Sequence, residues 1–347
     1  RITFDKNGLC NACQWSEEKK KINWAIREKQ LIRLLNKFKK SKNNYNCIVP
    51  VSGGKDGSYI AYNLKHKYDM RPLCVTVTPP LELEIGKTNL KNFISSGYDL
   101  ITVDIDTNLM RDTNFIGFEK IGFPYFGWLT AIHTAVAKVA YSFDIPLVFY
   151  AEDGEVEYGG TKEKQNKQLY NFDYQKKVYL ENHYKILKNA INKYSGKYFF
   201  EYPKRTDKIL LTHWSYYENW DPYRNYLIAK KYCGLQEADS ANTGTFTNFA
   251  QNDQAMYTLH TYLMYLKFGF GRAAQDACIE IRRGAMDREQ AKNLVNLYDG
   301  FFPEDIDIYL DYYKISKSKF NSILRKFTNK KLFDIKNNKV IKKFDIL

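Results

Sequence analysis

The stretch IVPVSGGKDGSY, residues 48–59, decides the fold. Its apolar beginning predicts a short buried strand over Cys47–Val51, and a helix is expected to begin near Gly57 and to continue over 59–67. Between them lie Gly53 and Gly54, which let the backbone approach a bound anion closely. The start of the helix adds partial positive charge at the same place. The stretch therefore predicts a phosphate-binding turn between a strand and a helix.

The side chains of this turn suit a phosphate and a divalent cation. Lys55 is a cationic donor, the serines carry hydroxyl donors, and the Asp56 carboxylate suits Mg²⁺. A plain strand–turn–helix junction rich in small residues is the alternative, and the Lys-Asp pair argues against it. The pattern matches neither the GxxxxGK(S/T) loop nor the GxGxxG fingerprint. The residues expected to contact phosphate are Ser52, Gly53, Gly54, Lys55, Asp56, Gly57 and Ser58.

Strands and helices alternate after this turn. Because the strands are continuous apolar runs, we predict an α/β fold with a parallel, doubly wound sheet covered on both faces. The further strands are expected over 73–78, 100–105, 145–151 and 209–211, with helices over 87–96 and 127–143. We assign residues 44–232 to this domain, with a Lys-, Asn- and Tyr-rich insertion over 161–207. A charged helix over 15–43 precedes it, and residues 233–347 are expected to be mainly helical, over 253–283, 287–298, 304–313 and 316–328.

Composition places the chain among soluble globular proteins, with 44% hydrophobic and 27% charged residues. The longest apolar run, 145–151, is far too short to cross a bilayer, so we expect a cytoplasmic protein without a membrane partner. The net charge of +14 favours an anionic partner. The basic residues are spread over many segments, however, as a general compositional preference of the source would also produce. Nucleic acid is therefore not the expected partner.

Six cysteines in 347 residues do not make a disulfide scaffold. Cys10 and Cys13 form a CxxC pair, whose thiolates could share one tetrahedral Zn²⁺. Structural zinc needs four ligands, and no second CxxC or His pair follows, so residues 1–43 would hold half of a zinc ribbon. The remaining ligands would then lie upstream of Arg1. The other cysteines are expected to be buried and inert, namely Cys47, Cys74, Cys233 and Cys278.

The SGGKDGS turn resembles the SGGxDS loop of PP-loop ATP pyrophosphatases, with Gly57 where that family usually has Ser. In that family the loop grips the pyrophosphate part of ATP and leaves the α-phosphate open to attack. Longer blocks resemble the N-acetyl sugar amidotransferases of bacterial surface-polysaccharide and flagellin-sugar pathways. These blocks are 83–101, 122–128, 151–160, 267–284 and the CxxC-W opening, so the resemblance spans nearly the whole chain. It implies a PP-loop fold of the HUP-like, adenine nucleotide alpha hydrolase-like type.

The resemblance also implies a reaction. ATP with Mg²⁺ would adenylylate the N-acetyl oxygen of a nucleotide-linked sugar, and ammonia would then replace AMP to give an acetamidino group. An amide oxygen leaves poorly, so adenylylation turns it into a leaving group, and Lys55 and Mg²⁺ would neutralise charge on the α-phosphate. The chain has no evident glutaminase nucleophile. The resemblance implies a separate glutaminase subunit as the ammonia source, joined by a cyclase-like channel subunit.

A second candidate constellation is the acidic turn AEDGEVEYGG, residues 151–160. It follows an expected strand, so its carboxylates should emerge at the same sheet edge as the phosphate-binding turn. Such groups can hold Mg²⁺, guide ammonium or accept its proton. We expect Asp153 and Glu155 to be catalytic and Glu157 to contact substrate, with Glu152 in the same group. A solvated acidic turn is the alternative.

A third candidate is the basic stretch over 267–284. Its cationic side chains could bind the phosphates or the carboxylate of a nucleotide-linked sugar, and they are Lys267, Arg272, Arg282 and Arg283. The alternative is an amphipathic helix with a solvated basic face. The aromatic segment 123–128 could line a nucleotide or sugar pocket, although packing is the commoner fate of such residues.

Two other functions share part of this pattern. Many tRNA-thiolating enzymes carry an SGGxDS loop, and a basic protein suits a tRNA backbone. Those enzymes need a catalytic cysteine or an iron–sulfur cluster near the loop, and the segment 122–128 supplies no cysteine. A noncatalytic nucleotide-binding scaffold is the other alternative, which the intact Lys55 and Asp56 disfavour.

Overall fold

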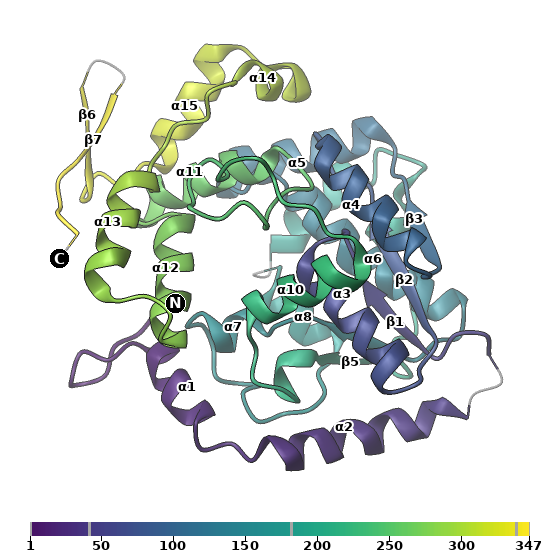
Figure 1. The fold of residues 1–347 in the computed structure, drawn as a ribbon. Coiled ribbons are helices and arrows are strands. Elements are labelled where there is room, and N and C mark those ends of the chain that lie inside the picture. Colours follow the sequence, from purple (N-terminus) through teal and green to yellow (C-terminus); the bar gives the residue numbers. More distant parts are fainter. Residues whose placement is uncertain (1, 41–42, 181–182, 337–338, 347) are drawn as a thin grey trace.

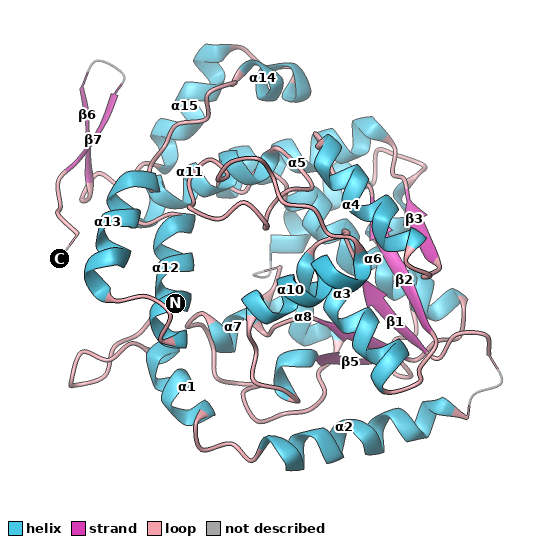
Figure 2. Cartoon of the chain, in the orientation of Figure 1, coloured by secondary structure: helices cyan, strands magenta, loops and turns pink. Residues whose placement is uncertain are grey.

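The computed structural model describes residues 2–40, 43–180, 183–336 and 339–346. At its centre lies a parallel five-stranded sheet in the order β3-β2-β1-β4-β5 (Figures 1 and 2). The strands are β1 (Cys47–Pro50), β2 (Pro72–Val77), β3 (Leu100–Val103), β4 (Leu147–Tyr150) and β5 (Leu210–His213). The predicted α/β fold with a parallel sheet is therefore confirmed.

Both faces of the sheet are covered, which explains why its strands are apolar without alternation. Ile48 and Val148 face α6, whereas Val49 and Phe149 pack on the other face with residues of α2 and α3. All six residues of β2 are buried. Neighbouring side chains of a strand point to opposite faces, so a strand buried on both faces needs apolar residues at every position.

Helices surround the sheet and form a second, helical region (Figure 2). The helices before and around the sheet are α1 (Asn11–Lys19), α2 (Trp24–Lys39), α3 (Lys55–Tyr62), α4 (Glu84–Ser95), α5 (Thr107–Ile121), α6 (Phe126–Ser142), α7 (Gly154–Glu157), α8 (Phe172–Val178), α9 (Lys188–Ile191) and α10 (Pro222–Cys233). The later ones are α11 (Met256–Phe268), α12 (Arg272–Arg283), α13 (Arg288–Tyr298), α14 (Asp307–Tyr313) and α15 (Lys317–Phe327). Shorter 3₁₀ and π turns occur at 63–67, 183–187, 197–200 and 214–216.

The strand order sets the position of a crevice. From β1 the chain moves outward to β2 and β3, and it then returns to place β4 on the opposite side of β1. The connections that leave β1 and β4 therefore diverge to opposite faces of the sheet. In open parallel sheets, ligands bind outside the carboxyl ends of the strands at such a reversal. The turn after β1 and the acidic turn after β4 are the two segments at this point.

The prediction of a single N-terminal helix over 15–43 is wrong, because this region forms the two helices α1 and α2. Asn23 starts the second one, and its side-chain oxygen accepts a hydrogen bond from the backbone N–H of Ile26 at 3.2 Å. The helix expected over 253–283 is likewise divided. Gly269 ends α11 in the left-handed conformation with φ of +79°, and α12 begins at Arg272. Both breaks use cap residues that helical periodicity does not reveal.

Helix α5 and a C-terminal hairpin were not expected. Helix α5 begins after Asp106, whose carboxylate accepts a hydrogen bond from Leu109 N–H at 2.9 Å, and ends at Gly122 with φ of +64°. The C-terminal part also holds an antiparallel hairpin of β6 (Phe333–Lys336) and β7 (Lys339–Lys342). In the described residues of the insertion, 161–180 and 183–207, the regular elements are short helical segments.

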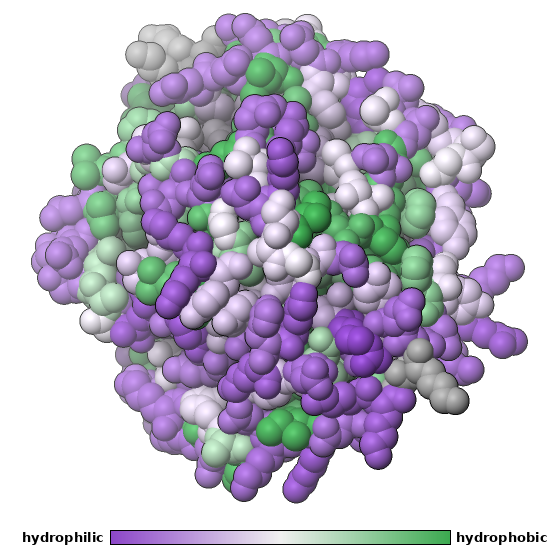
Figure 3. Space-filling model, turned by 45° about the vertical axis from the view of Figure 1, so that its right-hand side comes forward, coloured by the Kyte–Doolittle hydropathy of each residue, from purple (hydrophilic) through white to green (hydrophobic). Residues whose placement is uncertain are grey.

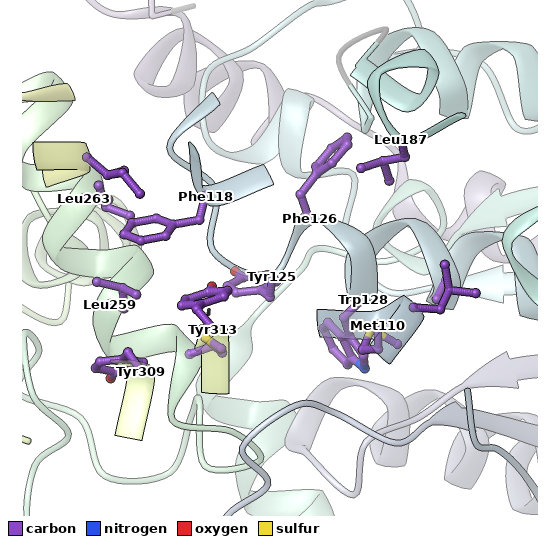
Figure 4. Packing of buried hydrophobic residues seen from close by; sticks show 14 of the residues in the cluster. Met110, Phe118, Tyr125, Phe126, Trp128, Leu187, Leu259, Leu263, Tyr309 and Tyr313 are labelled. Atoms are coloured by element: carbon purple, nitrogen blue, oxygen red, sulfur yellow. Dashed lines mark hydrogen bonds between the residues drawn. The ribbon is translucent and has the colours of Figure 1, made fainter. Parts of the chain in front are cut away.

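The helical region has its own core, built from α5, α6, α11, α14 and α15 (Figure 4). Phe118 of α5 stacks on Tyr313 of α14 with ring centroids 5.2 Å apart, and the Tyr313 hydroxyl donates a hydrogen bond to the carbonyl of Pro124. Leu259 and Leu263 of α11 lie beside these rings in Figure 4. The C-terminal helices are thus anchored on α5 and on the segment that leads into α6.

On the face drawn in Figure 3, hydrophilic side chains predominate and hydrophobic ones lie in small separate groups. Within the part of the chain that the structure describes, every helix is too short or too polar to cross a membrane.

Candidate functional site

The turn after β1 has the geometry of an anion site. Gly53 has φ of +78°, and Gly54 precedes α3 without any side-chain hydrogen bond that would cap the helix. The first N–H groups of a helix need a partner from outside the helix, and anions are favoured there because of the helix dipole. The turn is also tightly packed, since a Cβ atom on Gly53 would lie 2.5 Å from the backbone nitrogen of Leu90 in α4.

Two residues of the predicted motif lie beneath this turn. A Cβ atom on Gly57 would lie 2.9 Å from the carbonyl oxygen of Pro50, so glycine at this position lets α3 approach β1 closely. Ser58 is fully buried, and its hydroxyl has no hydrogen-bond partner among the described residues. The Ser58 side chain does not line the cavity described next, whereas Gly57 does.

Lys55 and Asp56 form an ion pair with each other at the mouth of the turn. Asn225 of α10 is fully buried and donates a hydrogen bond from Nδ2 to Asp56 Oδ1 at 3.0 Å. The side chains of Lys55 and Asp56 are only 14% and 21% exposed. A charged pair held by a buried amide is ordered before any ligand arrives, which is the arrangement that electrostatic catalysis requires.

A cavity of about 330 Å³ opens over the turn. From the motif it is lined by Ser52, Gly54, Lys55, Asp56 and Gly57. Its other walls come from α4, from Tyr125 before α6, from Glu152, from the segment 249–253 and from Arg272 of α12. Its volume lies within the range of small-molecule sites. Tyr125 is the only member of the aromatic segment 123–128 among the residues that line this cavity, while Trp128 and Phe126 belong to the core.

Glu152 is the carboxylate that the acidic turn contributes to this cavity. Burial raises the pKa of Glu152, and the nearby negative charge of Asp56 raises it further. The Tyr158 hydroxyl donates a hydrogen bond to Glu152 Oε1 at 3.2 Å. Two carboxylates close together favour a bound cation or a shared proton. Mg²⁺ in nucleotide enzymes is commonly held by one or two carboxylates together with phosphate oxygens, so Asp56 and Glu152 fit that ion.

The structure places Asp153 and Glu155 away from the cavity. Asp153 is buried behind the turn, where the Tyr179 hydroxyl donates to its Oδ1 at 2.9 Å and His213 Nδ1 lies 3.9 Å from Oδ2. Glu155 folds back on its own segment and accepts a hydrogen bond from Thr161 N–H at 3.0 Å. Both carboxylates thus hold the acidic turn in shape, and Glu152 occupies the place that we expected them to take.

The remaining predicted residues lie in different places. Arg272 lines the cavity over the turn and forms an ion pair with Asp276 at 2.8 Å. Glu157, Arg282 and Arg283 line a separate cavity near α1. Lys267 lines none of these cavities, and its ammonium group donates a hydrogen bond to the carbonyl of Ile121 at 3.1 Å. The four basic side chains of 267–284 therefore have different surroundings: three line one or the other of two cavities, and the fourth makes a structural contact.

Asp253 is a residue of the cavity wall that the motifs did not reveal. It lies in a segment that packs closely against α4, because a Cβ atom on Gly86 would lie 2.6 Å from Asp253 Cα. Burial raises the pKa of the Asp253 carboxyl to about 6. The Tyr257 hydroxyl donates a hydrogen bond to Asp253 Oδ2 at 3.3 Å. Gly86 lies just before the helix expected over 87–96 and inside α4 as observed, and this glycine is the sequence signal of a close backbone approach at this place.

We expect Asp253→Asn to stabilise the protein at neutral but not at acidic pH. A carboxyl whose pKa is raised in the folded state destabilises that state once it ionises, so the penalty is absent below about pH 4 and complete above about pH 6. At about 1.4 kcal/mol per pKa unit, the gain at pH 7.5 is at most about 3 kcal/mol. Urea denaturation across this range measures it, with the exposed Asp173→Asn as the control. A gain of the same size at pH 4 and pH 7.5 would contradict the ionisation account.

The cysteines resolve into two groups. Cys47, Cys74 and Cys233 are buried as predicted, and burial raises the pKa of each thiol. The prediction for Cys278 is wrong, because this residue is exposed on α12. Cys10 caps α1 by accepting a hydrogen bond from Cys13 N–H at 3.4 Å. Within the described ranges, no group of three or more His, Cys, Asp or Glu side chains is placed to hold a metal ion.

Comparison with known proteins gives two matches. Residues 243–345 match the family described as "LPS biosynthesis protein WbpG-like, C-terminal domain". A stretch of 76 residues is 33% identical to "Uncharacterized protein MJ1599" of Methanocaldococcus jannaschii, and it covers 22% of this chain and 27% of that protein. The chain thus spans about a quarter of the length of this curated relative. The family match covers the C-terminal third of the chain, which contains α11 to α15 and Arg272, and this region is similar to a domain of lipopolysaccharide-biosynthesis proteins.

Proposed function

We propose that this protein is an ATP-dependent amidotransferase of the PP-loop type, which converts the N-acetyl group of a nucleotide-linked sugar into an acetamidino group. The observation that carries this proposal is the cavity over the turn, where Lys55, Asp56, Glu152 and Arg272 meet above the uncapped start of α3. The match of residues 243–345 to a lipopolysaccharide-biosynthesis family supports a sugar substrate. The resemblance of the SGGKDGS turn to PP-loop enzymes supports ATP as the activating substrate.

In the proposed first step the chain positions ATP for attack at its α-phosphorus. The N–H groups at the start of α3 and the Ser52 hydroxyl would hold the β- and γ-phosphates. Lys55 and Arg272 lie in the same cavity and would neutralise charge that develops as pyrophosphate leaves. Mg²⁺, held by Asp56 and Glu152, would supply further positive charge on the phosphate oxygens. The acetamido oxygen forms a bond to phosphorus, and the bond to pyrophosphate breaks.

In the second step ammonia attacks the activated acetamido carbon. AMP leaves with the former acetamido oxygen, and the nitrogen loses protons to give the amidine. A group in the cavity must accept a proton from the attacking nitrogen. Once pyrophosphate and Mg²⁺ have left, Glu152 suits this role, because burial raises the pKa of the metal-free carboxyl above that of an ordinary one. A glutaminase subunit, joined by a cyclase-like channel subunit, is our proposed source of ammonia, and a zinc ion on Cys10 and Cys13 is a proposed structural component.

Mass spectrometry tests this function directly. The protein is incubated with ATP, ammonium and UDP- or CMP-linked N-acetyl sugars, and the mass of the nucleotide-linked sugar is then measured. Replacement of oxygen by NH lowers its mass by about one unit, with one AMP and one pyrophosphate formed per product. ATP cleavage without a change in any sugar, alongside a modified tRNA, would support the thiolation alternative. If ATP is not cleaved with any acceptor, the enzymatic proposal is wrong, and a noncatalytic nucleotide-binding scaffold is favoured.

Glu152→Gln separates the proposed proton acceptor from the other carboxylates of the acidic turn. We expect amidine formation to fall by about 10²-fold, the usual contribution of a general base. Glu163→Gln is the matched control, because Glu163 forms an exposed ion pair with Lys177 and lines neither cavity that receives predicted site residues. Equal rates for the two variants, measured by the release of pyrophosphate and by product mass, would remove Glu152 from the mechanism.

A further inference from the structure

A second cavity, of about 320 Å³, lies between the N-terminal helices and the C-terminal end of α12. Figure 1 shows α1 beside that end of α12. Four cationic side chains line the cavity, together with two tryptophans: Lys19, Lys20, Arg282, Arg283, Trp24 and Trp220. Glu157 and Asp221 are its acidic residues, so the ionisable lining carries two more positive than negative charges. The cavity thus favours an anion.

Its cations differ in how far they are already paired. Lys19 forms an ion pair with Glu157 at 2.6 Å, and Arg283 pairs with Asp221 at 3.1 Å. Arg282 forms no ion pair or hydrogen bond with any residue in 2–40, 43–180, 183–336 or 339–346, although it is only partly exposed. A guanidinium group carries five N–H donors in a planar fork that matches phosphate oxygens. Arg282 is therefore the group in this cavity that is available to a ligand.

The tryptophans supply a second, independent feature. The exposed fraction of Trp220 is 5%. Its indole N–H has no hydrogen-bond partner among the described residues. A buried donor without a partner carries an energetic penalty that a bound acceptor would remove. Trp24 is partly buried at the start of α2. Indole rings stack well on flat nucleobases. The cavity thus combines a free cationic fork with aromatic surface and an unsatisfied donor.

A third cavity, of about 290 Å³, shares lining residues with this one and with the cavity over the turn, and we call it the connecting cavity. It shares Tyr158, Pro222 and Ile279 with the second cavity. It shares Lys55, Glu152 and Arg272 with the cavity over the turn. Its remaining walls include Phe246, Thr247 and Met286. The connecting cavity therefore adjoins both the basic cavity and the side chains proposed to do chemistry.

We infer that the second cavity binds the nucleoside diphosphate part of the acceptor, and that its sugar extends through the connecting cavity toward Lys55 and Glu152. This inference rests on the proposed function, because it assigns a place to the acceptor of that reaction. Arg282 contacts the diphosphate, and Trp24 contacts the base. ATP and the acceptor then occupy separate sites that meet at Lys55, Glu152 and Arg272.

Binding of UDP, followed by tryptophan fluorescence and calorimetry on the full chain, tests the inference without any turnover. We expect UDP to bind with and without saturating ATP. We expect Arg282→Ala to weaken UDP binding about tenfold or more, and Arg282→Lys to weaken it less, because Lys keeps the charge and loses the fork. Arg33→Ala, which removes the same charge from the exposed face of α2, should bind UDP as the parent does.

Displacement of UDP by ATP, or equal UDP binding by Arg282→Ala and the parent, would overturn the inference. Non-competitive inhibition by UDP against the nucleotide-linked sugar would also overturn it, because the cavity would then serve an effector. Intact, Arg282-dependent UDP binding with no amidine product would instead reject the proposed function and leave the nucleotide site standing. A rise in KM for the sugar but not for ATP in Arg282→Ala would support both.

Discussion

Asp56→Asn is expected to lower ATP-dependent pyrophosphate release by about 10²–10³-fold while leaving the fold intact. The substitution preserves the shape of the side chain, so Asn225 can still contact it, but it removes the charge that pairs with Lys55. It also removes one of the two carboxylates proposed to hold Mg²⁺. Release of pyrophosphate and the thermal unfolding curve, measured on the same preparation, separate a loss of chemistry from a loss of structure.

Asp112→Asn is the matched control. Asp112 also pairs with the basic residue that precedes it, since Arg111 lies 2.9 Å away, and the pair lies on α5 outside the cavity over the turn. We expect this variant to release pyrophosphate at the parental rate. Normal activity of Asp56→Asn would exclude its carboxylate from both cation binding and the alignment of Lys55.

Gly53→Ala is expected to have the largest effect on stability and to abolish ATP binding. A non-glycine residue in the left-handed region costs about 1–2 kcal/mol, and crowding against a packed backbone adds about 1–3 kcal/mol. The new Cβ atom would lie 2.5 Å from Leu90 N and 2.7 Å from the carbonyl carbon of Asn89, so α4 or the turn must move. Urea denaturation and calorimetric titration with ATP measure the two effects.

Gly284→Ala separates backbone strain from crowding. Gly284 ends α12 with φ of +74°, close to the value at Gly53, but a Cβ atom there has no neighbour within 4 Å. This control should lose only about 1–2 kcal/mol and should bind ATP normally. If both variants lost the same stability, contact between the turn and α4 would play no part in shaping the site.

The sequence reveals much of the sheet and the phosphate-binding turn, because both depend on local patterns. Four-residue apolar runs with adjacent glycines specify strand and turn within one short window, and β1 followed by α3 was predicted for that reason. The order of the strands is not local. No pattern near Leu147 states that β4 returns beside β1, and that placement brings Glu152 to the cavity over the turn.

Local patterns also do not show which of the neighbouring carboxylates of the acidic turn faces the cavity. Glu152 and Asp153 are adjacent, so after an extended strand their side chains leave on opposite sides, and only the packing of Tyr179 and His213 shows which side is closed. Charge alone favoured all four basic residues of 267–284 equally. The structure instead places three of them in two cavities and leaves Lys267 in contact with Ile121. This division follows from where α11 ends and α12 begins.

Helix α1 lines part of the second cavity, and it is held there by hydrogen bonds to one buried carboxylate. Glu157 receives the indole N–H of Trp15 at 2.9 Å and the ammonium group of Lys19 at 2.6 Å, so α1 is bonded to the turn that carries Glu152. Deleting α1 would leave the Glu157 carboxylate without these donors. Substitutions elsewhere in residues 16–24 can therefore reshape the second cavity while the cavity over the turn stays intact, whereas loss of α1 would disturb both cavities together.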